Sequence, residues 1–131
     1  MAKSFTSLEQ SKKLAEILPI ESADMSFVSC DDGRQKYYQA ENRKIILNYE
    51  KNHWLPCWSL AALLNILPNN ENISINLSKG GFRISTLKHT NDWFVDYEDE
   101  SDGLNNCVTS ADNPIDACVA MILKLHELNL L

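Results

Sequence analysis

Several features of membrane and secreted proteins are missing from this sequence of 131 residues. The longest apolar run, Leu60 to Leu67, is interrupted by Asn65 and is much shorter than the roughly 18–20 residues that span a membrane. The N-terminus leads into a polar stretch and not into the apolar core of a secretory signal. We therefore expect a cytoplasmic protein that does not partner a membrane.

Closely spaced cysteine pairs are also missing. The chain has four cysteines, Cys30, Cys57, Cys107 and Cys118, and none of them forms a CxxC pair. This spacing argues against a zinc knuckle and against a redox dithiol. Because a chain of this length can build its own core, we expect free, buried thiols, although an even count also permits disulfides. No motif in the sequence indicates a cofactor.

Positive charge is scarce as well. Twelve basic residues stand against eighteen acidic residues, which gives a net charge of −6 at pH 7. A protein that binds nucleic acid normally presents a basic face to the phosphates, whereas the basic residues here form only short clusters such as Lys12-Lys13 and Arg43-Lys44. We therefore expect a protein partner, of unknown identity, and no DNA or RNA partner.

The length and the apolar patterning predict a single α+β domain over residues 1–131. The first helix is expected to begin at Thr6, whose hydroxyl would cap a backbone amide while Glu9 reaches back to the cap residue. Pro19 ends it, because proline does not continue a helix. Its solvent side is expected to carry Lys12 and Lys13.

Two further helices are predicted from capping signals. Ser59 is a good N-cap for a short buried helix that Pro68 ends. Asn113-Pro114 opens the last helix, since proline suits the first helical position. The apolar stripe of this last helix is Ile115, Cys118, Val119, Ile122 and Leu125.

An antiparallel three-stranded or larger meander is expected between the last two helices. Apolar residues alternate with polar ones over residues 73–77, 82–86 and 93–97, with turns at Gly80-Gly81 and at residues 90–92. We expect the N-terminal, central and C-terminal helices to pack against this meander. Residues 20–56 are expected to form short strands or ordered loops, including a turn at residues 31–33 and a strand at residues 44–50.

Three segments resemble a family of small uncharacterised proteins from gut-bacterial genomes and their phages. They are TSLEQSKKL from Thr6, PCWSLAALLNILP from Pro56 and NPIDACVAMILKL from Asn113. The resemblance implies a stand-alone domain and carries no active site. From it we expect an accessory factor of a phage or mobile element.

Cys57-Trp58-Ser59 is the most specific catalytic candidate, because a Cys-Trp pair that opens a helix resembles the nucleophile segment of papain-like peptidases. A helix N-terminus lowers a thiol pKa, and His89 would act as the base. However, Leu55-Pro56 replaces the Gly-Ser pair of many such enzymes, and the chain has no room for a second lobe. We therefore favour a structural Cys57 and keep a cysteine-dependent hydrolase as the alternative.

Metal sites are weaker candidates. His53, Cys57, His89 and Cys107 would bind zinc only if the fold gathered them, since only one pair is closely spaced. Residues 98–103 resemble the opening of a calcium loop, but Thr109 stands where a bidentate carboxylate is required. The sequence thus predicts no metal site and a solvated acidic loop.

The aromatic residues suggest a binding role. Trp54, Trp58, Trp93 and Tyr97 would supply core packing and part of a groove for a peptide or small molecule. The order of helix, three strands and helix from Ser59 onward is also that of double-stranded RNA-binding domains, but Asp112 and Asp116 stand where lysines would hold phosphates. The sequence therefore favours a non-catalytic protein-binding or adaptor module.

Overall fold

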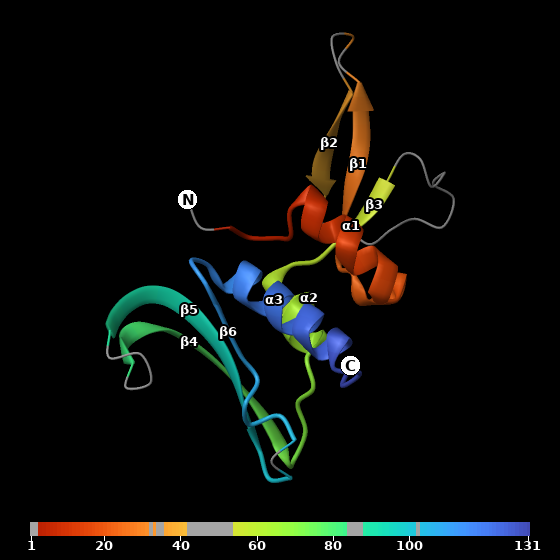
Figure 1. Ribbon diagram of the computed structural model, residues 1–131. Helices are drawn as coiled ribbons and strands as arrows, with labels where there is room; N and C mark the ends of the chain where they lie inside the picture. Colours follow the sequence, from red (N-terminus) through yellow and green to blue (C-terminus); the bar gives the residue numbers. More distant parts are fainter. Residues whose placement is uncertain (1–2, 32, 34–35, 42–53, 84–87, 102) are drawn as a thin grey trace. The chain divides into compact units, whose positions relative to one another are not determined.

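The structure is a computed structural model that describes residues 3–31, 33, 36–41, 54–83, 88–101 and 103–131. The chain divides into two compact units (Figure 1): an N-terminal unit, Ser4–Ala62, and a C-terminal unit, Leu63–Leu131 together with Met1–Lys3. Each unit combines helix with an antiparallel sheet, so the predicted α+β class is confirmed. The single domain over residues 1–131 stays a prediction.

The sheet of the N-terminal unit has three antiparallel strands in the order β2-β1-β3. They are β1 (Met25–Asp31), β2 (Lys36–Glu41) and β3 (Trp54–Cys57). The short strands expected in this region are confirmed for β1 and β2, and Gly33 between them has φ 85°, a turn conformation that glycine adopts freely. The strand expected at residues 44–50 lies outside the described residues.

Helix α1 (Leu8–Ile17) begins one residue later than its capping signal predicts. Its N-cap is Ser7, whose hydroxyl accepts a hydrogen bond from the Gln10 backbone N–H, while the Gln10 side chain accepts one from the Ser7 N–H. The predicted pair of Thr6 and Glu9 is therefore wrong by one position. Thr6 is fully buried, and its hydroxyl bonds elsewhere in the unit.

A short 3-10 turn, η1 (Ile20–Ser22), follows α1, and helix α2 (Leu60–Ile66) spans the boundary between the two units. The predicted N-cap of α2 is confirmed: the Ser59 hydroxyl accepts from the Ala62 backbone N–H. Asp24 in turn accepts hydrogen bonds from the Ser59 backbone N–H and hydroxyl. Asp24 thereby fixes the residue that starts the helix.

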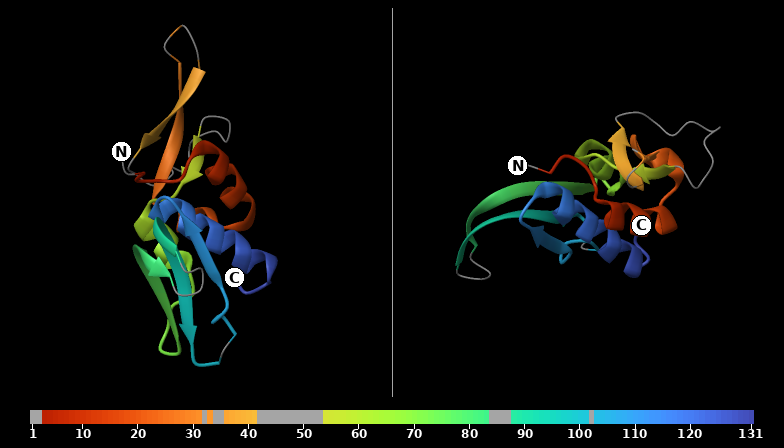
Figure 2. Two further views of the ribbon diagram at one scale, coloured as in Figure 1. Left: turned by 60° about the vertical axis from the view of Figure 1, so that its left-hand side comes forward. Right: turned by 90° about the horizontal axis from the view of Figure 1, so that it is seen from above.

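The sheet of the C-terminal unit is the predicted antiparallel meander, in the order β4-β5-β6. Its strands are β4 (Ile73–Arg83), β5 (Lys88–Asp99) and β6 (Val108–Ala111). Figure 2 shows β4 (green) and β5 (teal) as two curved strands that lie side by side, and β6 is much shorter than either. The meander is confirmed, but two of its strands are longer than the sequence predicts.

Two predicted turns in this meander are wrong. Gly80-Gly81 lies inside β4, where the register shifts and Gly80 adopts φ 47°. A bulge with glycine in a left-handed conformation keeps the strand going, so the glycines mark a bulge and not a turn. Residues 90–92 lie inside β5, and the third strand is β6, a segment for which no strand was predicted.

Helix α3 (Pro114–Glu127) confirms the last predicted helix and its cap. The Asn113 side chain accepts from the Asp116 backbone N–H, and Pro114 occupies the first helical position. The helix packs on β5 and β6. Its predicted stripe is buried in full and, with two further helix residues, forms much of the core: Ile115, Ala117, Cys118, Val119, Met121, Ile122 and Leu125.

Candidate functional site

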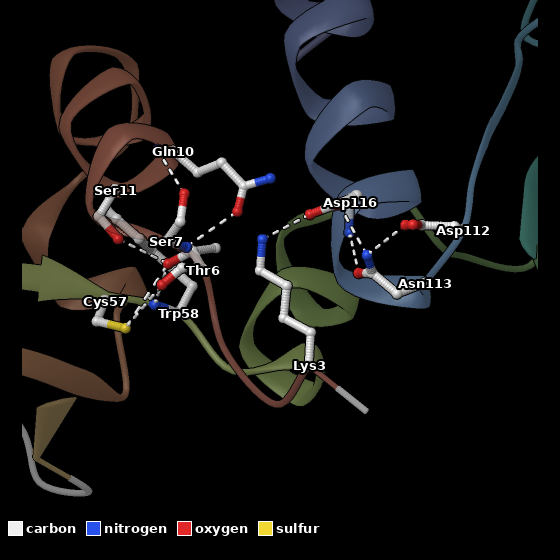
Figure 3. Close-up of polar contacts among 10 residues, drawn as sticks. All are labelled: Lys3, Thr6, Ser7, Gln10, Ser11, Cys57, Trp58, Asp112, Asn113 and Asp116. Carbon is white, nitrogen blue, oxygen red and sulfur yellow. Dashed lines mark hydrogen bonds and ion pairs between the residues drawn. The ribbon is translucent and has the colours of Figure 1, made fainter. Parts of the chain in front are cut away.

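Cys57 lies at the end of β3 with a fully buried side chain. Its sulfur accepts a long hydrogen bond from the Thr6 hydroxyl at 3.7 Å and donates to the Thr6 carbonyl at 3.6 Å (Figure 3). Burial is the main influence on this thiol and raises its pKa. A nucleophilic cysteine needs the opposite shift and access to substrate. The His89 side chain lies outside what the structure describes, so a pair with Cys57 stays untested.

The polar contacts around Cys57 form a closed network (Figure 3). The Thr6 hydroxyl accepts from the Trp58 backbone N–H at 3.1 Å and also bonds the Ser11 hydroxyl at 2.7 Å. The Thr6 backbone N–H donates to the Trp58 carbonyl at 2.9 Å. Each of these groups has a hydrogen-bond partner within the buried network, which is the arrangement expected of residues that stabilise the fold.

The predicted aromatic binding residues lie in different surroundings. Trp58 is fully buried, and its indole N–H donates to the Ser22 hydroxyl at 3.0 Å. Tyr97 is only 4% exposed, so both side chains serve the cores of their units. Trp93 is half-buried and keeps part of its surface available. The Trp54 side chain lies outside the described part of the chain.

The acidic loop after β5 is organised by a residue that the sequence analysis did not single out. The Asp99 carboxylate accepts hydrogen bonds from the backbone N–H and hydroxyl of Ser101 and from the Leu104 backbone N–H. The bonds from Ser101 hold the pKa of this carboxyl below its usual range. Aspartate side chains commonly accept from the backbone N–H two residues further on in turns, so Asp99 itself is the sequence signal for this turn. Asp99 therefore closes the loop.

Among the described residues, no group of three or more histidine, cysteine, aspartate or glutamate side chains is placed to hold a metal ion. Cys57 and Cys107 lie in different units, and His53 is not among the described residues. No helix within the described ranges combines the length and the apolar character needed to cross a membrane.

The outer surface of the C-terminal sheet presents a different kind of site. Val95 and Tyr97 are buried on the side that faces α3, and side chains alternate along a strand. Phe94, Asp96 and Glu98, which alternate with them along β5, therefore lie on the opposite side, and we call these three residues together with their cross-strand partners the open face. Its members, taken with their cross-strand partners, are Ser74, Asn76, Ser78, Phe94, Asp96, Glu98, Val108 and Ser110.

The open face is polar and accessible. Six of its eight residues are exposed, while Phe94 and Asp96 are half-buried. Asp96 lies at its centre, directly between Asn76 of β4 and Val108 of β6. The Asp96 Oδ1 atom is buried and has no hydrogen-bond partner within the described part of the chain. A buried carboxylate oxygen without a hydrogen-bond donor lowers the stability of the fold.

An acidic pocket adjoins the open face, and Ser74 and Glu98 belong to both. None of the residues around it is basic; the lining consists of Glu71, Asn72, Ser74, Glu98, Asp99, Glu100 and Asn105. Sequence alternation at residues 93–97 predicts which side of β5 is buried. It does not predict the register that sets Asp96 between the other two strands.

No family model, no curated protein and no solved structure matches this chain.

Proposed function

We propose that this protein is a non-catalytic protein-binding or adaptor module that binds its partner through the open face. The observation that carries the proposal is a sheet with α3 on one side and exposed polar residues on the other. A surface with half-buried Phe94 beside exposed hydroxyl, amide and carboxylate groups offers both contact area and directional hydrogen bonds. The net charge of −6 favours a protein over a nucleic acid as the partner.

We further propose that the protein acts in the cytoplasm as an accessory factor of a phage or mobile element. Resemblance of three segments to proteins of gut bacteria and their phages supports an accessory role in a phage or mobile element. The scarcity of apolar runs in the sequence supports action in the cytoplasm.

The alternative function, a hydrolase that uses Cys57, is less well supported. The thiol is buried within a network of structural hydrogen bonds, and burial raises its pKa. We expect iodoacetamide to modify Cys57 slowly in the folded protein at neutral pH and quickly after denaturation. Peptide mass spectrometry reads the labelling of each cysteine, with a Cys57→Ala variant as the control. Fast, selective labelling of native Cys57 would favour the hydrolase.

A capture experiment tests the open face itself. The protein serves as bait in a lysate of its native host, beside an Asn76→Arg variant that places a bulky cation at the centre of the open face. Asn65→Arg is the matched control, because Asn65 is exposed and lies on α2. We expect one defined protein to be retained by the wild type and the control and lost with Asn76→Arg. Equal retention by all three baits would contradict the proposal.

A further inference from the structure

We propose that the free edge of β4 pairs with the same edge of a second copy of this chain, about a two-fold axis at Leu77. In the described part of the chain, β4 has β5 on one side and no strand on the other. It is 11 residues long, whereas β6, the other edge strand of this sheet, has 4. A long edge strand is a template for pairing with another chain.

Hydrogen bonds at the start of β4 show which of its backbone groups face outward. The Asn72 carbonyl accepts from the Glu100 N–H at 3.0 Å, so it points towards β5. Ile73 instead bonds the backbone of Asn70, to which its N–H donates at 3.3 Å and from which its carbonyl accepts at 2.9 Å. These directions alternate along a strand. Every second residue from Ile73 onward therefore directs its N–H and carbonyl away from β5.

The free part of this edge has three outward residues, Ile75, Leu77 and Lys79. Within the described residues, none of them makes a backbone hydrogen bond beyond the β4–β5 ladder. The turn from Asn70 occupies the edge before them, and the bulge at Gly80 bends the strand after them. Leu77 is thus the centre of a segment that is bounded at both ends. An antiparallel strand with the same bounds fits it, and a second copy supplies that strand.

Pairing about Leu77 uses every outward group of this segment. Leu77 lies opposite Leu77 of the second copy, and Ile75 of each copy lies opposite Lys79 of the other. Each of these residue pairs exchanges two backbone hydrogen bonds in an antiparallel ladder. A register centred on Asn76 instead would press Lys79 of one copy against the Asn70 turn of the other. The bounds of the segment therefore select the register.

The side chains on the α3 side of β4 favour the same pairing. Ile75 and Leu77 are the cross-strand partners of the buried Tyr97 and Val95, yet they are only half-buried themselves. Helix α3 packs on β5 and β6, further from this edge. Across the two-fold axis the two Leu77 side chains contact each other, and the apolar area that they bury stabilises the dimer.

Charge and polarity match as well. Residues 73–78 carry no charged side chain, so the pairing sets no like charges opposite each other. Asn76 of each copy lies opposite Ser78 of the other, where an amide and a hydroxyl form a favourable polar pair. The antiparallel order also brings the end with the exposed Glu71 towards the end of the other copy with the exposed Lys79. A second copy is therefore complementary to this edge in charge.

Sedimentation velocity of the purified full chain, from low to high micromolar concentration, should show a reversible monomer–dimer equilibrium. Leu77→Pro removes an outward N–H and leaves the β4–β5 ladder intact. We expect it to weaken dimerisation about tenfold, which corresponds to about 1.4 kcal/mol. Leu77→Lys should have a similar effect, because it sets two ammonium groups opposite each other. Val108→Lys, the control, adds the same charge at an exposed position of β6 and should leave dimerisation unchanged.

Two further measurements test the register. Mixing Leu77→Lys with Leu77→Glu should restore association, because unlike charges then lie opposite each other at the axis. Amide hydrogen exchange, followed by NMR, should slow at Ile75, Leu77 and Lys79 as the concentration of the wild type rises. The amides of Asn76 and Ser78, which face β5, should not respond to concentration.

A wild type that stays monomeric at every concentration would overturn the inference. So would a dimer that Leu77→Lys and Val108→Lys weaken equally, or a mixture of Leu77→Lys and Leu77→Glu that does not associate. Should Leu77→Pro fail to fold, Leu77→Lys and the exchange of the wild-type amides decide the question. A monomeric chain that still captures a partner through the open face would uphold the adaptor function and refute the paired edge, so the two proposals fail separately.

Discussion

The two units of the chain have interiors of different chemistry. In the C-terminal unit the fully buried α3 side chains are apolar or weakly polar, and Ile115, Ile122 and Leu125 are typical. In the N-terminal unit the hydroxyls of Thr6 and Ser11 are buried as completely. Burial of apolar surface is non-directional, whereas buried hydroxyls contribute only when their hydrogen bonds are complete. The stability of the C-terminal unit should therefore be most sensitive to lost side-chain volume, and that of the N-terminal unit to lost hydrogen bonds.

The largest effect is expected from a cavity in the C-terminal unit. Ile122→Ala removes three carbons from a fully buried position on α3. We expect a loss of about 2–4 kcal/mol in the free energy of unfolding, because the transfer term and the cavity term add. Urea denaturation followed by circular dichroism measures it.

Ile122→Val is the matched control, with an expected loss of about 0.5–1.5 kcal/mol. A loss below about half a kcal/mol for Ile122→Ala would mean that α3 does not depend on this contact.

The second effect concerns the buried network of the N-terminal unit. Thr6→Val keeps the shape of the side chain but removes the acceptor of the Trp58 backbone N–H and a partner of Ser11. We expect a loss of about 1–3 kcal/mol, because a buried donor is left without a partner. Urea denaturation monitored by tryptophan fluorescence measures the change, since Trp58 lies in this network.

Thr6→Ser retains the hydroxyl and loses one methyl group, so its cost should be about 1 kcal/mol. If valine were tolerated as well as serine, the hydroxyl network would not stabilise this unit, and the contrast between the two interiors would disappear.

The same contrast explains which parts of the fold the sequence predicts. Helix α3 is predicted with its cap and its buried stripe, because an apolar pattern with a period of 3.6 residues reports burial directly. The start of α1 is predicted one residue early, because Thr6-Ser7 offers two hydroxyls in succession and only tertiary contacts decide between them. The sequence therefore predicts the bounds of a helix best where the helix buries apolar side chains.

The candidate site is predicted less well. Alternation at residues 93–97 identifies the buried side of β5, but the partners of Asp96 on both neighbouring strands depend on register. The bulge at Gly80 and the length of β4 are set by pairing over many residues, so they do not follow from the glycine pair alone. Two of the aromatic residues proposed for binding, Trp58 and Tyr97, lie in the cores of their units instead, because their large apolar area favours burial.

The smallest effect is expected at the surface of the C-terminal unit. The Lys3 ammonium group lies 2.7 Å from the Asp116 carboxylate in the first turn of α3, and the two side chains remain 28% and 33% exposed (Figure 3). Solvent screens such a pair, and Asp116 also accepts a hydrogen bond from the Asn113 side chain, so its carboxylate stays bonded without the lysine. Lys3→Ala should therefore cost about 0.2–1 kcal/mol in the free energy of unfolding.

A double-mutant cycle with Asp116→Asn, measured by urea denaturation at low and at high salt, isolates the energy of the Lys3–Asp116 pair. The coupling should shrink at high salt, because the charges are exposed to screening ions. Ile122→Ala should cost nearly the same at both salt concentrations, since burial of an apolar side chain involves no charge. A salt-independent coupling above about 2 kcal/mol would instead identify Lys3–Asp116 as a desolvated pair. The stability of the C-terminal unit would then depend on a specific ionic contact as well as on apolar burial, and the contrast with the N-terminal unit would be one of degree.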